Sequence, residues 1–262
     1  MKVEKVNVGL VGLGMVCESH LKAYSAHPDA EVLAVCDLDA ARSKEIAIKY
    51  GIPRTYTSYK QMLQDQEINT VDITTPTILH SQMALAAALA GKNILCEKPF
   101  CLTLTAGQEV CDAARSMGVT LMVGESYIFM TSLKQARALI EAGEIGKPQQ
   151  IRQRFGSWIE RPGVLETDRP VTDNHRGWRI DSTKAGGAGF PWMFDHCVHF
   201  FATAEYLMGA RVEEVYALKS DISWMKAAYR VDEGETHVYQ PEDSGDIPII
   251  TWTYNDPACQ GV

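Results

Sequence analysis

The sequence has no long apolar segment and no excess of positive charge. Its apolar runs are only a few residues long, far short of the ~20 residues that a membrane helix needs. Lysine and arginine number 25 against 33 aspartate and glutamate residues, which gives a net charge of -8. Such a surface repels phosphate backbones and anionic lipids, so we expect neither nucleic acid nor a membrane among the partners.

Cysteine is present but lacks the spacing of a structural site. The seven cysteines are an odd set without a C-x-x-C pair, and several stand in apolar runs where a small buried thiol fits. We therefore expect reduced thiols, with no disulfide framework and no metal. The first residues lead into a short strand rather than a signal-peptide core, and we expect the protein in the cytoplasm.

Internal repeats and low-complexity tracts are also absent from the 262 residues. Apolar residues make up 46% and charged residues 22% of the chain, a composition that excludes a disordered, collagen-like or coiled-coil protein. At roughly 150 residues per domain, the length suggests one large domain or two modest ones, and we expect two.

Short apolar runs alternate with segments of helical period through the first 125 residues. The expected strands lie at about 5–11, 31–36, 70–74, 93–96 and 119–123, and the expected helices at 15–26, 40–50, 78–91, 103–117 and 131–142. This βαβ alternation predicts a doubly wound parallel sheet with helices on both faces. Gly51, Gly91 and Gly118 stand where helices should end.

The pattern changes after Gly143. Residues 161–189 are rich in proline, glycine, aspartate and arginine without a clear period, which predicts a long functional loop or several short ones. The remaining expected elements are strands at 149–155, 212–219 and 247–254 and a helix at 191–208. The fold class is therefore α/β, with a doubly wound parallel sheet at 1–124 and a second α/β domain at 125–262 whose sheet is expected to be incomplete.

A candidate dinucleotide site follows the first strand. Gly12 allows a tight turn, Gly14 lets a pyrophosphate approach the backbone, and the helix start at Met15 and Val16 offers free N–H groups. Asp37 ends the second strand, where an acid accepts bonds from ribose hydroxyls. A 2′-phosphate would meet this carboxylate, so we expect NAD rather than NADP. Alternatively, the glycines only cap a helix and Asp37 only begins a turn.

Three further residues are candidates for catalysis. Lys98 follows the fourth expected strand, at the edge where open α/β sheets bind ligands, and a lysine there can stabilise an alkoxide. Asp195 and His199 are i and i+4 in the expected long helix, and a histidine oriented by a carboxylate is a usual general base. Alternatively, Lys98 pairs with Glu97 or solvent, and Asp195 and His199 form an ordinary ion pair on the helix surface.

Together these motifs resemble the Gfo/Idh/MocA family of NAD(P)-dependent oxidoreductases. The matching features, in family order, are the Gly12–His20 element, Thr74-Thr75-Pro76 with His80, Glu97-Lys98-Pro99, Gly143–Gly146, Trp178-Arg179, and Gly-Gly-x-Gly before Asp195 and His199. The chain departs from the family pattern at two positions where the family has glycine. Cys17 replaces the third glycine of the nucleotide motif, and Cys197 replaces the glycine between the expected catalytic residues Asp195 and His199. Most members are also longer, which leaves full activity open.

The resemblance implies a Rossmann domain and a second domain whose open sheet covers the active site and often mediates homo-oligomers. It implies oxidation or reduction of a secondary alcohol of a sugar, glycoside or cyclitol at the nicotinamide. By motif position, Lys98 contacts the substrate oxygen and the cofactor ribose, His199 is the acid/base, and Asp195 is its partner or a second substrate ligand. Thr75, Pro76, His80 and Glu97 would line the cofactor. Further substrate contacts are expected at Tyr127, Trp158, His175, Trp178 and Arg179.

Two other functions stay open at this point. One is a catalytically weak or inactive dinucleotide-binding protein with an incomplete C-terminal domain. The other is an enzyme with retained NAD that oxidises and then re-reduces its substrate, for a net transfer, elimination or glycoside cleavage.

Overall fold

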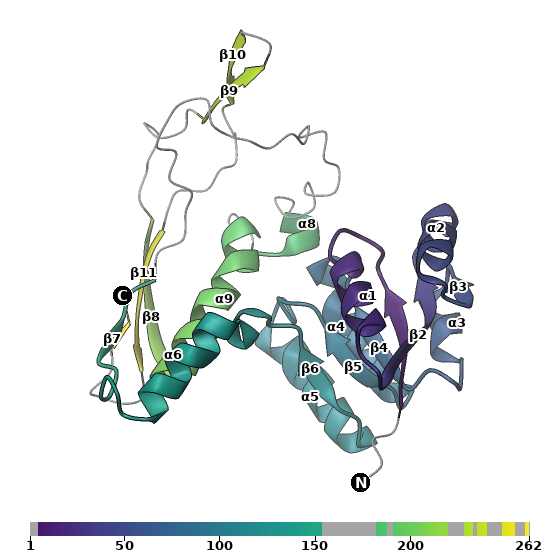
Figure 1. Cartoon of the computed structure of the whole chain (residues 1–262), viewed down its shortest axis with the longest axis horizontal. Coiled ribbons are helices and arrows are strands. Elements are labelled where there is room, and N and C mark those ends of the chain that lie inside the picture. The colour runs from purple at the N-terminus through teal and green to yellow at the C-terminus, as the bar shows by residue number, and fades with distance from the viewer. Residues whose placement is uncertain are drawn as a thin grey trace. The chain divides into compact units, whose positions relative to one another are not determined.

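The computed structural model describes residues 5–153, 182–187, 191–219, 228–232, 235–239, 248–254 and 260–261 (Figure 1). The chain divides into two compact units, one formed by residues 1–125 and 174–195 and the other by 126–173 and 196–262. The first unit is thus discontinuous in sequence, whereas the sequence pattern predicts two contiguous domains that meet at residue 125.

The first unit contains a six-stranded sheet in which every pair of neighbours is parallel. Its strands are β1 (Val6–Val11), β2 (Ala30–Cys36), β3 (Arg54–Tyr56), β4 (Thr70–Ile73), β5 (Asn93–Cys96) and β6 (Leu121–Val123). The connecting helices are α1 (Cys17–Ser25), α2 (Ala40–Tyr50), α3 (Tyr59–Leu63), η1 (Thr77–Leu79), α4 (His80–Leu89) and α5 (Leu104–Met117). The order β3-β2-β1-β4-β5-β6 is that of a Rossmann fold, which confirms the predicted fold class.

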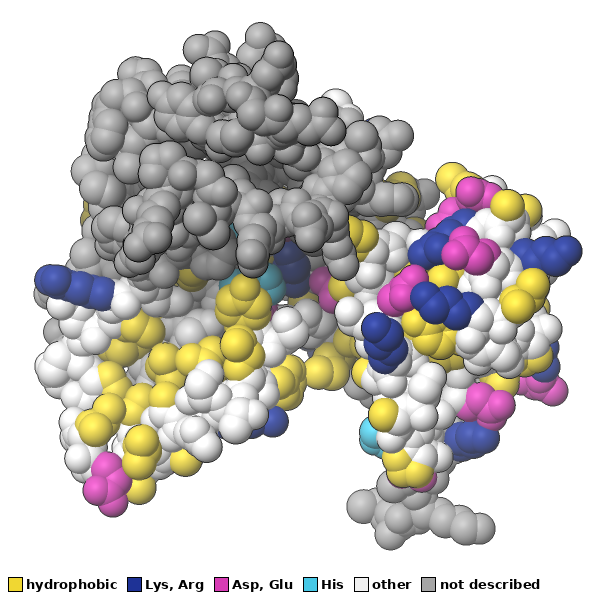
Figure 2. All heavy atoms as spheres, turned by 45° about the horizontal axis from the view of Figure 1, so that its top comes forward, with side chains coloured by type: hydrophobic (Ala, Val, Ile, Leu, Met, Phe, Trp, Pro, Cys, Tyr) yellow, Lys and Arg dark blue, Asp and Glu magenta, His cyan; other side chains and the backbone are white. Residues whose placement is uncertain are grey.

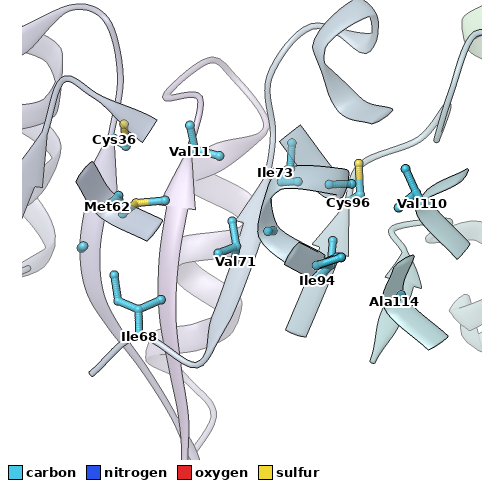
Figure 3. Close-up of a cluster of buried hydrophobic side chains, with 14 residues drawn as sticks. Val11, Cys36, Met62, Ile68, Val71, Ile73, Ile94, Cys96, Val110 and Ala114 are labelled. Atoms are coloured by element: carbon cyan, nitrogen blue, oxygen red, sulfur yellow. The ribbon is translucent and has the colours of Figure 1, made fainter. Parts of the chain in front are cut away.

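Helices cover both faces of this sheet. Successive side chains of a strand point to opposite faces, and β1 carries apolar side chains toward both. Leu10 of β1 belongs to a buried cluster with Leu21 of α1. The next residue, Val11, belongs to the cluster on the other face, with Val71 of β4 and Val110 of α5. Figure 3 shows this second cluster, in which strand and helix side chains meet without a polar neighbour among those drawn.

The helix ends of the first unit follow signals that the sequence carries. The Asp39 side chain caps α2 by accepting hydrogen bonds from the N–H groups of Ala41 and Arg42. Gly51 and Gly118 end α2 and α5 in the left-handed conformation, each with a φ of 67°. The predicted glycine caps are therefore confirmed at these two helices.

Two short elements within residues 1–125 were not predicted. β3 adds a sixth strand at the edge of the sheet, and α3 follows it directly. The three residues of β3 are too few and too exposed to give an apolar run: Thr55 is exposed, and its two neighbours are half-buried. Hydrophobic periodicity cannot detect a strand of this kind.

The second unit contains α6 (Thr131–Glu141), α9 (Pro191–Met208) from His196 onward, and a four-stranded sheet of order β7-β12-β11-β8. The strands are β7 (Gln150–Ile151), β8 (Val212–Lys219), β11 (Pro248–Tyr254) and β12 (Gln260–Gly261), with a separate hairpin of β9 (Ala228–Asp232) and β10 (Glu235–Tyr239). Helix α9 packs on the sheet through Ala204 and Met208, which share a buried cluster with Trp252 and Tyr254.

The predictions for α6, α9, β8 and β11 are confirmed, but others in the C-terminal half need correction. Strand β7 has only two residues, where the alternation predicted a strand at 149–155. Ser182–Ala185 forms the short helix α8 inside the stretch that was expected to be loop. β9, β10 and β12 were not predicted. The other residues of 161–189, apart from two that follow α8, lie outside the described part of the chain.

Both units expose large apolar side chains, among them Leu38 and Leu104 in the first. On the face that Figure 2 shows, positive and negative side chains are mixed over the first unit. The exposed apolar residues of the second unit include Phe129, Met130, Leu139 and Ile145. None of the described helices is both long enough and apolar enough to cross a membrane.

Candidate active site

The turn after β1 requires glycine. Gly12 has a φ of +91°, and a Cβ there would lie 2.7 Å from the main-chain nitrogen of Thr75 and 2.8 Å from the carbonyl carbon of Thr74. The Thr74 hydroxyl donates a hydrogen bond of 2.6 Å to the Gly12 carbonyl. Gly12 therefore allows the chain leaving β1 to lie against the chain leaving β4, where the strand order reverses and Rossmann folds bind their ligand.

Gly14 and the start of α1 leave an open edge beside this turn. A Cβ on Gly14 would meet no described atom within 4 Å. Met15 is 45% exposed, and Val16 at the N-cap of α1 makes no side-chain capping bond. An uncapped helix start next to an open glycine turn fits the pyrophosphate of NAD.

Cys17 occupies the position of the third glycine of the fingerprint. Its side chain is fully buried in the cluster that contains Leu10 and Leu21. Burial raises the pKa of the thiol to about 11, so it stays protonated at neutral pH and is a poor nucleophile. This small side chain therefore fits the contact between α1 and β1.

Asp37 is fixed against the glycine turn by two main-chain donors. Its Oδ2 accepts the Leu13 N–H at 2.7 Å, and its Oδ1 accepts the Asp39 N–H at 2.9 Å. The neighbouring Leu38 is 93% exposed and adds no charge. A carboxylate held here is in the place where Rossmann folds bind the adenosine ribose.

The sequence reading missed Arg42, a cation beside the same turn. Its Nε donates to the Leu13 carbonyl at 3.1 Å, and its guanidinium lies 3.0 Å from Glu45 and 3.7 Å from Glu18. The sequence feature that could have indicated it is the position of Arg42 in the first turn of the helix that follows Asp37. Because two carboxylates already pair with this guanidinium, it offers little free charge to a 2′-phosphate.

The two glycines of the turn make a matched pair of variants. We expect Gly12→Ala to lower the free energy of unfolding by about 1–3 kcal/mol, because its left-handed φ and main-chain contacts leave no room for a Cβ. Gly14→Ala should leave stability within about 0.5 kcal/mol and weaken NAD roughly tenfold, the loss of about one hydrogen bond. Urea unfolding and calorimetric titration with NAD measure both effects. Equal stability losses in the two variants would contradict this assignment.

The loop after β4 is joined to the loop after β5 through a buried histidine. His80 is 1% exposed, and its Nδ1 and Nε2 lie 2.7 Å from the carbonyl oxygens of Pro99 and Thr75 respectively. Burial lowers the pKa of His80. His80 thus links the main chain at Thr75 to the main chain at Pro99, and its predicted contact with the cofactor stays a prediction.

Lys98 and Asp195 form a nearly buried ion pair within the first unit. The Lys98 Nζ lies 3.0 Å from Asp195 Oδ1 and also donates to the Asp195 carbonyl oxygen at 3.2 Å. Their side chains are 11% and 1% exposed. The alternative that pairs Lys98 with Glu97 or solvent is therefore wrong. The sequence did not suggest this pair, because the two residues are 97 positions apart.

His199 lies in the second unit and is 6% exposed. Its ring stacks on Tyr127 with centroids 3.9 Å apart and planes 8° apart, and His196 meets it edge-on at 5.9 Å. Asp195 and His199 are both buried, so the alternative of an exposed ion pair on the helix surface is wrong. The expected coupling between them stays a prediction, since the described ion-pair partner of Asp195 is Lys98.

Four expected substrate contacts, Trp158, His175, Trp178 and Arg179, lie outside the described residues. Within the described ranges, no three histidine, cysteine, aspartate or glutamate side chains gather to hold a metal ion.

A parallel sheet of Rossmann order, a glycine turn at its switch point and an acid after β2 define a dinucleotide-binding protein. The chain belongs to the Gfo/Idh/MocA oxidoreductase family. Residues 6–125 match the model described as the NAD-binding Rossmann fold of this family, and residues 133–239 match its C-terminal domain. The predicted family and the predicted cofactor, NAD, are both confirmed.

Individual relatives agree with the family match. The chain is 32% identical to the uncharacterized oxidoreductase YrbE of Bacillus subtilis, over 82% of this chain and 57% of that protein. It is 27% identical to myo-inositol 2-dehydrogenase of Thermotoga maritima, over 81% of this chain and 58% of that protein. The structure of levoglucosan dehydrogenase with NADH and levoglucosan superposes with a TM-score of 0.75 at 25% identity, over 98% of this chain and 66% of that one. The chain thus spans less than three fifths of the two curated relatives.

Proposed function

We propose that the protein transfers a hydride reversibly between NAD and a secondary alcohol of a sugar, glycoside or cyclitol. The observation that carries this proposal is the nearly buried Lys98–Asp195 pair at the carboxyl edge of an NAD-binding sheet. An ammonium held there can stabilise the negative charge of an alkoxide. Relatives named for myo-inositol and levoglucosan support a polyhydroxylated substrate.

Each residue of the proposed site has a separate task. NAD, when bound, supplies the nicotinamide that exchanges the hydride. The Lys98 Nζ stabilises charge on the substrate oxygen, and Asp195 keeps this ammonium in place. A ring nitrogen of His199 accepts the hydroxyl proton, and the stacked Tyr127 ring restricts how the imidazole can turn. The residues proposed to border the cofactor are Gly12, Gly14, Met15, Val16, Asp37, Thr75, Pro76, His80 and Glu97.

A panel of sugars, glycosides and cyclitols tested with NAD and with NADP decides between the candidate functions. Net accumulation of NADH, followed by its absorbance, is the expected result. Tight NAD binding without turnover on any substrate would instead indicate a dinucleotide-binding protein of little activity. A transient absorbance of reduced nicotinamide without net NADH would indicate retained NAD and non-redox overall chemistry.

Cofactor preference tests the role of Asp37. We expect NAD to bind more tightly than NADP, because the added phosphate would meet a carboxylate that Leu13 and Asp39 hold in place. Asp37→Ala should narrow the difference between the two dissociation constants, measured by calorimetric titration. Glu109→Ala, which removes an exposed carboxylate on α5, is the control for a general change of charge. Equal NAD and NADP affinities in the unmodified protein would refute the assignment.

The cytoplasmic location and the homo-oligomer stay predictions. Val215 and Tyr216 of β8 are more than half exposed and support an association through the second unit's sheet. Cell fractionation tests the location, and light scattering on a size-exclusion column tests the oligomer.

A further inference from the structure

A partly buried histidine of the first unit, His20, contacts two carboxylates, and the functions proposed above do not use it. His20 lies on α1, with its side chain 15% exposed. Its Nδ1 lies 2.7 Å from Asp72 Oδ2 on β4, and its Nε2 lies 3.1 Å from Glu97 Oε1 just after β5. One ring therefore connects a helix to the ends of two neighbouring strands.

The surroundings of Asp72 require this ring to carry a charge. Asp72 is completely buried, and its Oδ2 also accepts the Tyr24 hydroxyl at 3.0 Å. Its Oδ1 makes no hydrogen bond within the described part of the chain. Ionised carboxylates only accept hydrogen bonds, so a ring between two of them must donate from both nitrogens, which only an imidazolium can do. Without that charge, two carboxylates would share a poorly solvated site.

Glu97 connects His20 to the main chain of Lys98. While its Oε1 faces His20, its Oε2 accepts the main-chain N–H of Lys98 at 3.1 Å. Gly124 leaves the room for this carboxylate, since a Cβ there would come within 3.3 Å of Glu97 Oε1. The position of the Glu97 side chain therefore fixes the backbone from which the Lys98 ammonium extends.

We propose that His20 is a positioning residue for Lys98, acting as a charged imidazolium that ties Asp72 to Glu97 and so holds the main chain at Lys98. The positioning role rests on the proposed function. The charged tie, by which we mean the His20 imidazolium between Asp72 and Glu97, does not. Burial alone lowers the pKa of His20, but the hydrogen bonds and charges of Asp72 and Glu97 outweigh it and raise the pKa to about 10. The ring should therefore stay protonated throughout the neutral range.

Nuclear magnetic resonance of the unmodified protein tests the charged tie, because it shows whether both ring nitrogens of His20 are protonated. With isotope-labelled histidine, we expect one of the seven imidazoles to keep both nitrogens protonated from pH 6 to about 9. Its signal is assigned by its absence in His20→Gln, or, if that variant does not fold, by its shift in Glu97→Gln. A His20 signal that titrates near pH 6.5, the ordinary value for histidine, would overturn the proposal whatever the activity of the protein.

Stability against pH gives a second test of the tie. The folded-state pKa of about 10 lies above the unfolded value of about 6.5, so His20 stabilises the fold fully below pH 6.5 and loses that effect as the pH rises through 10. The difference in unfolding midpoint between the unmodified protein and His20→Gln should therefore shrink from pH 7 to pH 10. A difference that stays constant over this range would overturn the charged tie.

Kinetics test the positioning role. His20→Gln removes the ring that contacts Glu97 Oε1, and Gly124→Ala adds a Cβ 3.3 Å from the same atom. Each should lower kcat by up to about 10²-fold, the cost of misplacing a reacting group by about 1 Å. Because Glu97 is also proposed to border the cofactor, kcat is measured at saturating NAD, so that a change in NAD affinity does not enter the comparison. The exposed His27 at the end of α1 is the matched control, and His27→Gln should keep the kcat of the unmodified protein. A folded His20→Gln protein with unchanged kcat would overturn the positioning role even if the imidazolium is observed.

Discussion

Lys98→Met should lower kcat by about a hundredfold or more, the usual loss when one preorganised electrostatic contact to a developing oxyanion is removed. Methionine keeps a similar length but has no charge. The Gly12–Val16 turn and Asp37 are untouched, so NAD should weaken only by about tenfold or less, the loss of the one expected contact between Lys98 and the ribose. Steady-state kinetics on a substrate from the panel, with a separate NAD titration, measures the two effects. A variant with the kcat of the unmodified protein would show that Lys98 is structural.

The same substitution has a cost in stability that must be separated from the catalytic loss. Lys98→Met leaves the 1% exposed Asp195 carboxylate without its ammonium, which typically costs about 3–5 kcal/mol for a buried pair. Lys98→Met combined with Asp195→Leu removes both charges and should restore much of that stability. If the double variant has the unfolding free energy of the unmodified protein but keeps the low kcat, the loss of turnover is a loss of catalysis and is not caused by unfolding.

Most of the first unit could be predicted from sequence because its signals are local. Leu10 and Val11 show why a strand buried on both faces reads as a continuous apolar run, and Gly12 marks its end. Edge strand β3 gave no such run, because only two of its three residues are even half-buried. Periodicity detects what is buried, so it fails first at the edge of a sheet.

The candidate site was harder to predict because its contacts are not local. The spacing of Asp195 and His199 suggested that they form a pair, since only neighbours within a helix can be inferred from spacing. The structure gives Asp195 a partner that lies 97 positions away along the chain, Lys98, through chain folding that no local pattern encodes. For the same reason, Asp72 reads in sequence as one polar residue in an apolar strand, and its contact with His20 is invisible.

His199→Asn should slow alcohol oxidation by about 10² to 10⁴, the usual contribution of a general base. Only a neutral imidazole can accept the hydroxyl proton, so oxidation by the unmodified protein should rise with pH as the ring loses its proton. This rise should be absent in His199→Asn. Tyr127→Leu, which removes the stacked ring but keeps the base, should retain the pH dependence at a lower rate. An unchanged pH profile in His199→Asn would show that another group takes the proton.

Two double-mutant cycles then decide whether Asp195 acts together with Lys98 or with His199. Residues that act as a unit give strongly non-additive losses, whereas independent residues give losses that multiply. The ion pair of 3.0 Å predicts that Asp195→Asn is non-additive with Lys98→Met, since each variant breaks the same contact. The i, i+4 spacing instead predicts non-additivity with His199→Asn. If the first cycle is coupled and the second multiplies, Asp195 acts by holding the ammonium that stabilises charge. If only the second is coupled, the carboxylate orients the base, and the Lys98–Asp195 contact does not control the rate.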